Sequence, residues 1–253
     1  MTPVGLFVLV YTFKLVLGTQ EGFIVGGNYV HAITKFPHVA FLTTYRADSA
    51  DEYICGSSIL NQWILITAAH CLDDTAKAIA SVGNVNREIG KLHRVASFKQ
   101  HENWDTIRVN HDIALCRLKK PVLLGHTVKR VVMVKHPPKS RVADLAGWGA
   151  TEENDYTETI QLKHTRQKLW NHKQCRKVFS RAPKGTICGG EARARGNYAS
   201  KGDSGSGLLV DNKIIVGLVS FKDPSVSRSL VIYTDVPYFY DWVKRTAKLL
   251  RCS

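Results

Sequence analysis

The sequence predicts an all-β protein built from barrels or sandwiches. Short runs rich in β-branched and aromatic residues recur along the chain, and Asp, Asn, Gly and Lys separate them. Strands do not alternate regularly with long helical segments, which argues against a parallel α/β sheet. The chain has 253 residues, of which 44% are hydrophobic and 22% are charged. A chain of this length and composition can bury a substantial core, which argues against wholesale disorder.

Branched and aromatic side chains predict six strands, at residues 39–45, 53–60, 63–67, 113–118, 207–210 and 213–220. Two further segments are predicted as helices. Residues 165–178 carry Leu, Trp and Val among basic residues, and residues 237–250 begin with a proline and have one apolar face. Residues 121–141, with their prolines, histidines and basic residues, are the predicted connection between two halves.

The N-terminus predicts a secretory signal peptide over residues 1–18 and a short propeptide over residues 19–23. Two apolar runs lead to Gly18, a small residue of the kind that signal peptidase requires. The alternative is a membrane anchor. Lys14 shortens the apolar stretch well below the ~20 residues that span a bilayer, which disfavours the anchor. We therefore expect a secreted, extracellular protein without a membrane span.

The six cysteines form an even set: Cys55, Cys71, Cys116, Cys175, Cys188 and Cys252. In a secreted chain an even set predicts three disulfides, and the spacing alone leaves their connectivity open. Metal binding is the competing interpretation, but the chain has no CxxC or HExxH spacing. We expect neither a metal nor a cofactor.

The chain carries 35 Lys and Arg against 21 Asp and Glu, a net charge of +14. Such a surplus favours acidic surfaces, glycans, nucleic acid or anionic membranes as neighbours. The basic residues gather in the two predicted helical segments: Lys163, Arg166, Lys168, Lys173, Arg176, Lys177, Arg181 and Lys184, and then Lys244, Arg245, Lys248 and Arg251. If these side chains are exposed, they could bind an acidic or sulfated extracellular partner. The alternative interpretation is a basic surface that contacts only solvent. No nucleic-acid module is visible, so we expect no nucleic-acid partner.

Three short stretches carry the residues that nucleophilic acyl transfer needs. His70 follows an apolar strand, Asp112 heads another, and Ser204 lies in a Gly-Asp-Ser-Gly sequence. A serine hydroxyl needs a base, the base needs an acid that holds its tautomer, and the oxyanion needs backbone donors. Each residue taken alone has a simpler interpretation: His70 as a histidine of the core, Asp112 as a turn residue and Ser204 as an unreactive loop serine. Together, in the order His, Asp, Ser, they favour a catalytic triad.

With these motifs, residues 24–252 resemble the trypsin/chymotrypsin-like serine peptidases (family S1). The resemblance rests on Ile24, Val25, Gly26 and Gly27, on Trp63 through Cys71, on Ala146, Gly147, Trp148 and Gly149, on Ser220 with Phe221, and on Tyr233 with Trp242. It implies two six-stranded antiparallel β-barrels packed against each other and a C-terminal helix. The peptidase domain would be residues 24–253, with barrels at about 24–125 and 138–236 and the helix at about 237–250.

The resemblance also implies a role for each residue of the site. Ser204 would be the nucleophile, His70 the general base and then acid, and Asp112 the acid that orients it. The backbone N–H groups of Gly202 and Ser204 would form the oxyanion hole. The substrate would be a protein or peptide, and we expect a monomer.

Cross-linking and processing follow from the same resemblance. It implies the disulfides Cys55–Cys71 and Cys175–Cys188, and the two remaining cysteines make the third pair, Cys116–Cys252. It also implies a zymogen, in which cleavage before Ile24 frees an ammonium that pairs with Asp203. Phe23 precedes that bond instead of Lys or Arg, so we expect a chymotrypsin-like activator or self-cleavage.

The specificity pocket (S1) departs from the family pattern. Tyr198 occupies the floor position, where an aspartate would select Lys or Arg, so trypsin-like specificity is not expected. Lys222 and Val231 occupy wall positions that are usually glycine, and they narrow the slot beside Ser220. Lys201 and Lys222 flank the entrance, which indicates either acidic residues in the substrate or two solvated lysines.

Two functions follow from this sequence. The first is a secreted serine endopeptidase that works through an acyl-enzyme. It is not trypsin-like and has a chymotrypsin- or elastase-like preference for the residue before the scissile bond (P1). The second is a catalytically weak peptidase homologue with an occluded S1 pocket, which acts as a binding protein for acidic partners.

Overall fold

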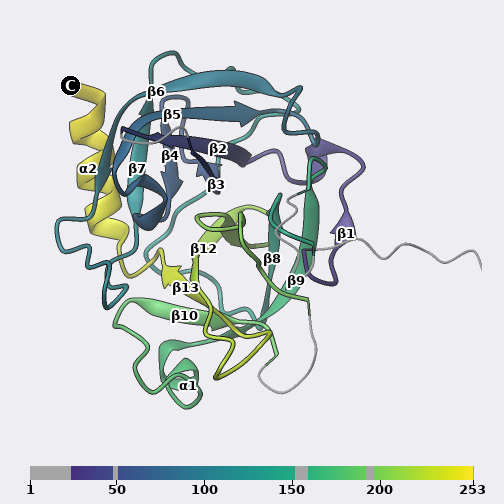
Figure 1. The fold of residues 1–253 in the computed structure, drawn as a ribbon, viewed down its shortest axis with the longest axis vertical. Coiled ribbons are helices and arrows are strands. Elements are labelled where there is room, and N and C mark those ends of the chain that lie inside the picture. The colour runs from purple at the N-terminus through teal and green to yellow at the C-terminus, as the bar shows by residue number, and fades with distance from the viewer. Residues whose placement is uncertain (1–23, 48–50, 152–158, 192–196, 253) are drawn as a thin grey trace, which may run out of the picture.

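The computed structural model describes residues 24–47, 51–151, 159–191 and 197–252, without the side chain of Cys252. The predicted signal peptide and propeptide lie outside these residues. The described chain forms two antiparallel β-barrels and a helix at the C-terminus (Figure 1). This architecture confirms the predicted fold class.

The N-terminal barrel has six strands, which close in the order β2-β3-β4-β7-β6-β5. Their bounds are Val39–Arg46 (β2), Glu52–Ile59 (β3), Ile64–Thr67 (β4), Thr75–Val82 (β5), Lys91–Gln100 (β6) and Ala114–Leu118 (β7). Small and aliphatic side chains such as Ala40, Leu42 and Leu65 fill the interior. Four of these strands, β2, β3, β4 and β7, are those that branched and aromatic residues predicted.

The C-terminal barrel is built from the later strands: Val142–Gly147 (β8), Lys163–Trp170 (β9), Thr186–Gly189 (β10), Gly207–Val210 (β11), Ile214–Phe221 (β12) and Val231–Asp235 (β13). They run in the order β9-β10-β13-β12-β11-β8, and pairing of β8 with β9 closes the ring. The two-residue strand Asn28–Tyr29 (β1) pairs with β9. Leu145, Leu208 and Tyr233 lie in the core of this barrel.

Among the described residues, one helix, at the C-terminus, is longer than four residues. The helical segments are Ile33–Lys35 (η1), His70–Leu72 (η2), His172–Cys175 (α1) and Tyr240–Cys252 (α2). α2 packs against β6 and β7 of the N-terminal barrel (Figure 1), and Trp242 and Val243 join a buried cluster with Ile64 and Leu115. Among the residues that the structure describes, no helix has the length and apolar content that a membrane span requires.

The predicted helix over residues 165–178 is wrong. Its first half is β9, in which Thr165 and Gln167 are buried while Arg166 and Lys168 point outward. That alternation has the two-residue period of a strand, which the many basic residues hide in the sequence. Helix begins only after Asn171, whose side chain caps α1, and a Cys175–Cys188 disulfide then joins α1 to β10 as predicted.

The predicted Cys116–Cys252 disulfide is also wrong, because Cys116 carries a free thiol in the described chain. Alternate side chains of β7 face opposite ways. Leu115 contributes to the cluster that contains α2, whereas Cys116 is fully buried inside the N-terminal barrel. The thiol is thus turned away from the helix. Burial raises its pKa to about 12.

Candidate active site

His70 stands where the apolar strand β4 ends. The strand and the following Ala68 and Ala69 are fully buried, and the one-turn helix η2 begins at His70. A Cys55–Cys71 disulfide joins this turn to β3, as predicted. The disulfide fixes the backbone next to His70 at the edge of the N-terminal barrel.

Asp112 holds His70 through both of its carboxylate oxygens. Oδ2 lies 2.8 Å from the ring Nδ1 of His70, and Oδ1 accepts from the backbone N–H of His70 at 2.9 Å. Burial lowers the pKa of His70, but the charge and hydrogen bond of Asp112 outweigh it and raise the pKa above 6.5. Burial pushes the pKa of Asp112 upward, and its contacts with His70 and Ser220 bring it below 3.8. Asp112 therefore remains ionised and stabilises positive charge on the imidazole more than water would.

Two strands of the opposite barrel support Asp112. The hydroxyl of Ser220 on β12 donates to Oδ2 at 2.5 Å, and the hydroxyl of Thr234 on β13 donates to the backbone carbonyl at 2.7 Å. The resemblance placed Ser220 on the substrate-binding strand, and the structure adds this contact with the acid. Sequence reasoning missed Thr234, because it lies 122 residues from Asp112 in the chain and no local pattern marks it.

The loop that carries Ser204 contacts the N-terminal barrel close to His70. The carbonyl of Ser204 accepts from the N–H of Gly56 at 2.7 Å. Gly205 has a φ of +77°, and a Cβ there would lie 2.1 Å from Oγ1 of Thr67. Only glycine fits such a close approach in a left-handed conformation. The glycine after the serine thus lets the two barrels meet at the site.

The backbone donors around Ser204 divide into two groups. The N–H groups of Asp203, Gly205 and Ser206 donate to carbonyls of the protein. Within the described residues, those of Gly202 and Ser204 donate to none. The two donors that the sequence assigned to an oxyanion hole are therefore the two left available for a ligand.

Ser204 and His70 are not hydrogen-bonded to each other in this structure. Across the described chain, the ring Nε2 of His70 makes one hydrogen-bonding contact, with Sγ of Cys71 at 3.9 Å. In unliganded sites such contacts are often long and tighten when substrate binds. Ser204 does line a small cavity together with Ser220, whose hydroxyl bonds Asp112. Ser204 thus shares a cavity with the side chain that bonds Asp112.

One group of side chains has the spacing of metal ligands. The donor atoms of Cys55, His70 and Cys71 lie within 4.8 Å of one another. Both sulfur atoms, however, belong to the Cys55–Cys71 disulfide. Disulfide sulfur is not the thiolate that binds zinc, so these residues do not fit a metal site.

Asp203 is fully buried behind the loop. Its carboxylate accepts from the N–H groups of Gly149 and Ser200 at 2.8 and 2.9 Å, yet burial raises its pKa to about 6. Ile24 is also fully buried, in the core of the same barrel, and Val25 pairs with Tyr198. The segment that begins at Ile24 thus occupies the interior of the barrel that carries the loop, and the described residues show no hydrogen bond or ion pair between Ile24 and Asp203.

The Gly-Trp-Gly motif surrounds the Asp203 carboxylate. A Cβ on Gly147 would lie 2.2 Å from Oδ1, and one on Gly149 would lie 2.4 Å from Cγ. Opposite Gly147 on β9 lies Lys163, which is fully buried and whose charge favours the ionised carboxylate. Burial lowers the pKa of this lysine to about 8. Sequence reasoning placed Lys163 on a basic surface, and only the strand alternation reveals it as buried.

Four of the residues predicted for the S1 pocket line one cavity of about 170 Å³, and the fifth, Tyr198, does not line it. The cavity is lined by Ala199, Ser200, Lys201, Ser204, Val219, Ser220, Phe221, Lys222 and Val231. Tyr198 is buried, and Nζ of Lys222 lies 4.2 Å from the centre of its ring. The ammonium of Lys222 therefore lies against the ring of the tyrosine that the resemblance assigned to the pocket floor. A larger cavity of about 830 Å³, lined in part by Ile107, shares Phe221 with the smaller one.

The fold and the arrangement of these residues are those of a known class of proteins, the serine peptidases. A family model described as Trypsin matches residues 24–243, so the chain belongs to the trypsin family of serine peptidases. Among its relatives, hypodermin-B of Hypoderma lineatum is 33% identical over 237 residues, which cover 90% of this chain and 89% of that protein. Granzyme E of Mus musculus is 27% identical over 258 residues, which cover 99% and 100%.

Solved structures agree on the fold. A structure of HL collagenase superposes with a TM-score of 0.78 at 21% identity, covering 88% of this chain and 98% of that one. At this identity the likeness shows the architecture alone.

Proposed function

We propose that this protein is a secreted serine endopeptidase that forms an acyl-enzyme on Ser204. The proposal rests on one observation: the buried carboxylate of Asp112 accepts hydrogen bonds from both the ring and the backbone N–H of His70. A carboxylate in this position fixes the imidazole tautomer and stabilises the imidazolium that forms during reaction. Secretion is supported by the apolar N-terminal sequence and by two disulfides.

In the proposed reaction, Nε2 of His70 takes the proton of the Ser204 hydroxyl while Oγ attacks the substrate carbonyl. The N–H groups of Gly202 and Ser204 stabilise the oxyanion. The imidazolium then protonates the leaving amine, and the peptide bond breaks to leave an ester on Ser204. Water, deprotonated by His70, hydrolyses this ester and restores the enzyme.

We propose a small P1 residue and a specificity unlike that of trypsin. Tyr198 replaces the acid that would pair with Lys or Arg. The cavity of about 170 Å³, narrowed by Lys222 and Val231, favours an elastase-like preference for small side chains over a chymotrypsin-like preference for aromatic ones. Two relatives at 27% identity, granzyme E and cathepsin G of Mus musculus, carry names other than trypsin.

Activation belongs to the same proposal. The buried Asp203 carboxylate is poorly stabilised in the uncut chain, as its raised pKa indicates. An α-ammonium on Ile24 would supply a positive charge in the same barrel core. Cleavage after Phe23 would then stabilise the loop that presents Gly202 and Ser204.

The test is hydrolysis of a peptide library by protein whose N-terminus has been sequenced as Ile24. We expect cleavage after Ala, Ser or Val, weak cleavage after Phe, and none after Lys or Arg. Ser204→Ala, purified in parallel, should cleave nothing. Equal activity of the Ser204→Ala protein would refute the mechanism, and cleavage after Lys would refute the specificity.

The contact between Lys222 and Tyr198 also favours a second candidate, the peptidase homologue with an occluded pocket. A fluorophosphonate separates the two, because it reacts with an activated serine without needing a P1 side chain. Labelling without peptide cleavage would indicate a working triad behind a closed pocket. Absence of labelling in correctly processed protein would favour the binding protein.

A further inference from the structure

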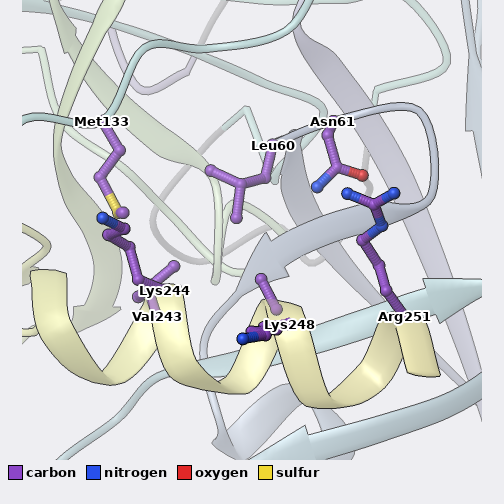
Figure 2. Close-up of a pocket in the computed structure, with 8 residues that line it drawn as sticks. Leu60, Asn61, Met133, Val243, Lys244, Lys248 and Arg251 are labelled. Carbon is purple, nitrogen blue, oxygen red and sulfur yellow. The ribbon is translucent and has the colours of Figure 1, made fainter. Parts of the chain in front are cut away.

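We propose that a groove along the C-terminal helix binds an acidic peptide segment that carries an apolar side chain. This α2 groove has a volume of about 540 Å³, within the range of roughly 300–1,000 Å³ that ligand sites occupy. It is lined by Leu60, Asn61, Met133, Val243, Lys244, Ala247, Lys248 and Arg251 (Figure 2). It shares no lining residue with the S1 cavity, so the inference is independent of the proposed function.

The floor of the α2 groove is apolar. Leu60, Met133 and Ala247 are half-buried and pack on the cluster that contains Val243 and Leu115. Figure 2 shows Leu60 and Met133 facing the helix from two separate segments of the chain. Water therefore reaches hydrocarbon at the bottom of a concave site, and a ligand with an apolar side chain would release it.

The helix rim of the α2 groove is cationic. Lys244, Lys248 and Arg251 are exposed and four and three residues apart, so they follow one face of α2. Among the described residues, none of the three forms a salt bridge. The acid in the first turn of α2, Asp241, already pairs with Lys135 at 2.6 Å. Lys244 lies 5.5 Å from the centre of the Tyr240 ring, a weak contact that leaves its charge in place. The rim therefore has three positive charges outside salt bridges that a ligand could neutralise.

The dimensions suit a short extended segment. Seven residues of helix separate Lys244 from Arg251, a rise of about 10 Å. An extended chain covers this length in about three residues. One acidic side chain for each one or two residues would therefore meet the rim.

An apolar floor beside a basic rim favours a peptide over a sulfated glycan. A glycan would gain from the cations, but its hydroxyl groups would lie unpaired against Leu60, Met133 and Ala247. An acidic peptide with Leu or Phe at intervals complements both surfaces. Basic residues near a helix C-terminus also stabilise the helix itself, and the experiment must separate that role from binding.

The experiment measures fluorescence anisotropy of a fluorescein-labelled peptide of alternating Glu and Leu, (Glu-Leu)₄. The protein is the full mature chain with Ser204→Ala, so the probe is not cleaved and binding does not depend on catalysis. We expect saturable binding. Lys244→Gln/Lys248→Gln/Arg251→Gln should weaken it at least about tenfold, since each lost ion pair contributes modestly. Ala247→Gln, which fills the groove and keeps the cations, should also weaken it.

Matched controls make the outcome decisive. Lys173→Gln/Lys177→Gln/Lys184→Gln removes the same charge from exposed sites around α1 and should leave the affinity within about twofold of the parent. Equal losses in both triple variants would show unspecific attraction and overturn the proposal. Binding of a heparin oligosaccharide but not of (Glu-Leu)₄, or equal binding of (Gln-Leu)₄, would overturn it too. Thermal unfolding of each variant confirms that it is folded.

Discussion

A single carboxylate joins the two barrels at the candidate site. Asp112 accepts hydrogen bonds from the ring and backbone of His70 on one side and from Ser220 on the other, and its carbonyl accepts from Thr234. Such a buried network stabilises one arrangement of the imidazole because every partner is satisfied. The position of the proposed base is thus decided by residues from both halves of the chain.

Asp112→Asn tests the role of this carboxylate. An amide would donate towards Nδ1 and favour the wrong imidazole tautomer, so kcat should fall by about 10³- to 10⁴-fold. The proposed base works only when neutral, and Asp112 raises the pKa of His70. The rise of activity with pH should therefore move to lower pH in the variant. The measurement is kcat against pH with a small-P1 peptide.

Ser220→Ala is the matched control for that change. It removes one hydrogen bond to Asp112 and keeps the charge, so the loss should be smaller, on the order of tenfold. A loss as large as that of Asp112→Asn, or an unchanged pH profile in Asp112→Asn, would contradict the assigned roles.

Among the strands and helices, those that have a clear side-chain pattern within a few residues could be predicted from the sequence. Six strand runs and the C-terminal helix show their periodicity within a few residues, and the motifs of His70, Asp112 and Ser204 are local. The helix predicted over residues 165–178 failed because basic residues hide the alternation of β9. Thr234 and Lys163 act on residues far away in the chain, so only the pairing of strands could reveal them.

Gly205→Ala tests the turn that presents the serine. The added methyl would meet Oγ1 of Thr67 and the carbonyl of Gly56 in a left-handed backbone. We expect a loss of about 2–4 kcal/mol in the free energy of unfolding and loss of activity. Denaturant unfolding monitored by fluorescence gives the first value. Gly125→Ala, where a Cβ would meet no atom within 4 Å, should change stability little.

Alternate side chains of β7 face opposite ways, and Cys116 faces the interior of the N-terminal barrel, so we expect two disulfides and a free Cys116 thiol. A peptide map without reduction should contain Cys55–Cys71 and Cys175–Cys188, with Cys116 recovered as a thiol. Because the thiol is buried and its pKa is raised, iodoacetamide should modify Cys116 only after unfolding. A peptide linking Cys116 to Cys252 would show that β7 or α2 is placed wrongly.

The whole molecule consists of two closed barrels with the candidate site where they meet. Ile24 and Asp203 are both buried in the C-terminal barrel, so we expect the stability of the molecule to depend on the charge of Asp203. In the uncut chain the pKa of Asp203 is raised by burial from 3.8 to about 6. The folded state therefore holds this proton more tightly than the unfolded state does. Protonated Asp203 therefore contributes to the free energy of unfolding below about pH 4, and this contribution is lost as the pH rises towards 6.

If the chain is cut before Ile24 as proposed, its stability should depend on pH differently before and after the cut. Between pH 4 and 6.5 the free energy of unfolding of the uncut chain should fall by about 2 kcal/mol more than that of the chain cut before Ile24. After cleavage, the new ammonium would favour the ionised Asp203. Urea unfolding of both forms across this range measures the difference. Parallel curves would argue against the ion pair between Ile24 and Asp203.

We propose that His70 and Asp112 activate Ser204. Mass spectrometry of protein processed at Ile24 and treated with a fluorophosphonate measures this activation. We expect one phosphonyl adduct, on the peptide that contains Ser204, and at least a hundredfold slower modification in Asp112→Asn. An unmodified Ser204 in folded, processed protein, or an adduct on another serine, would contradict it.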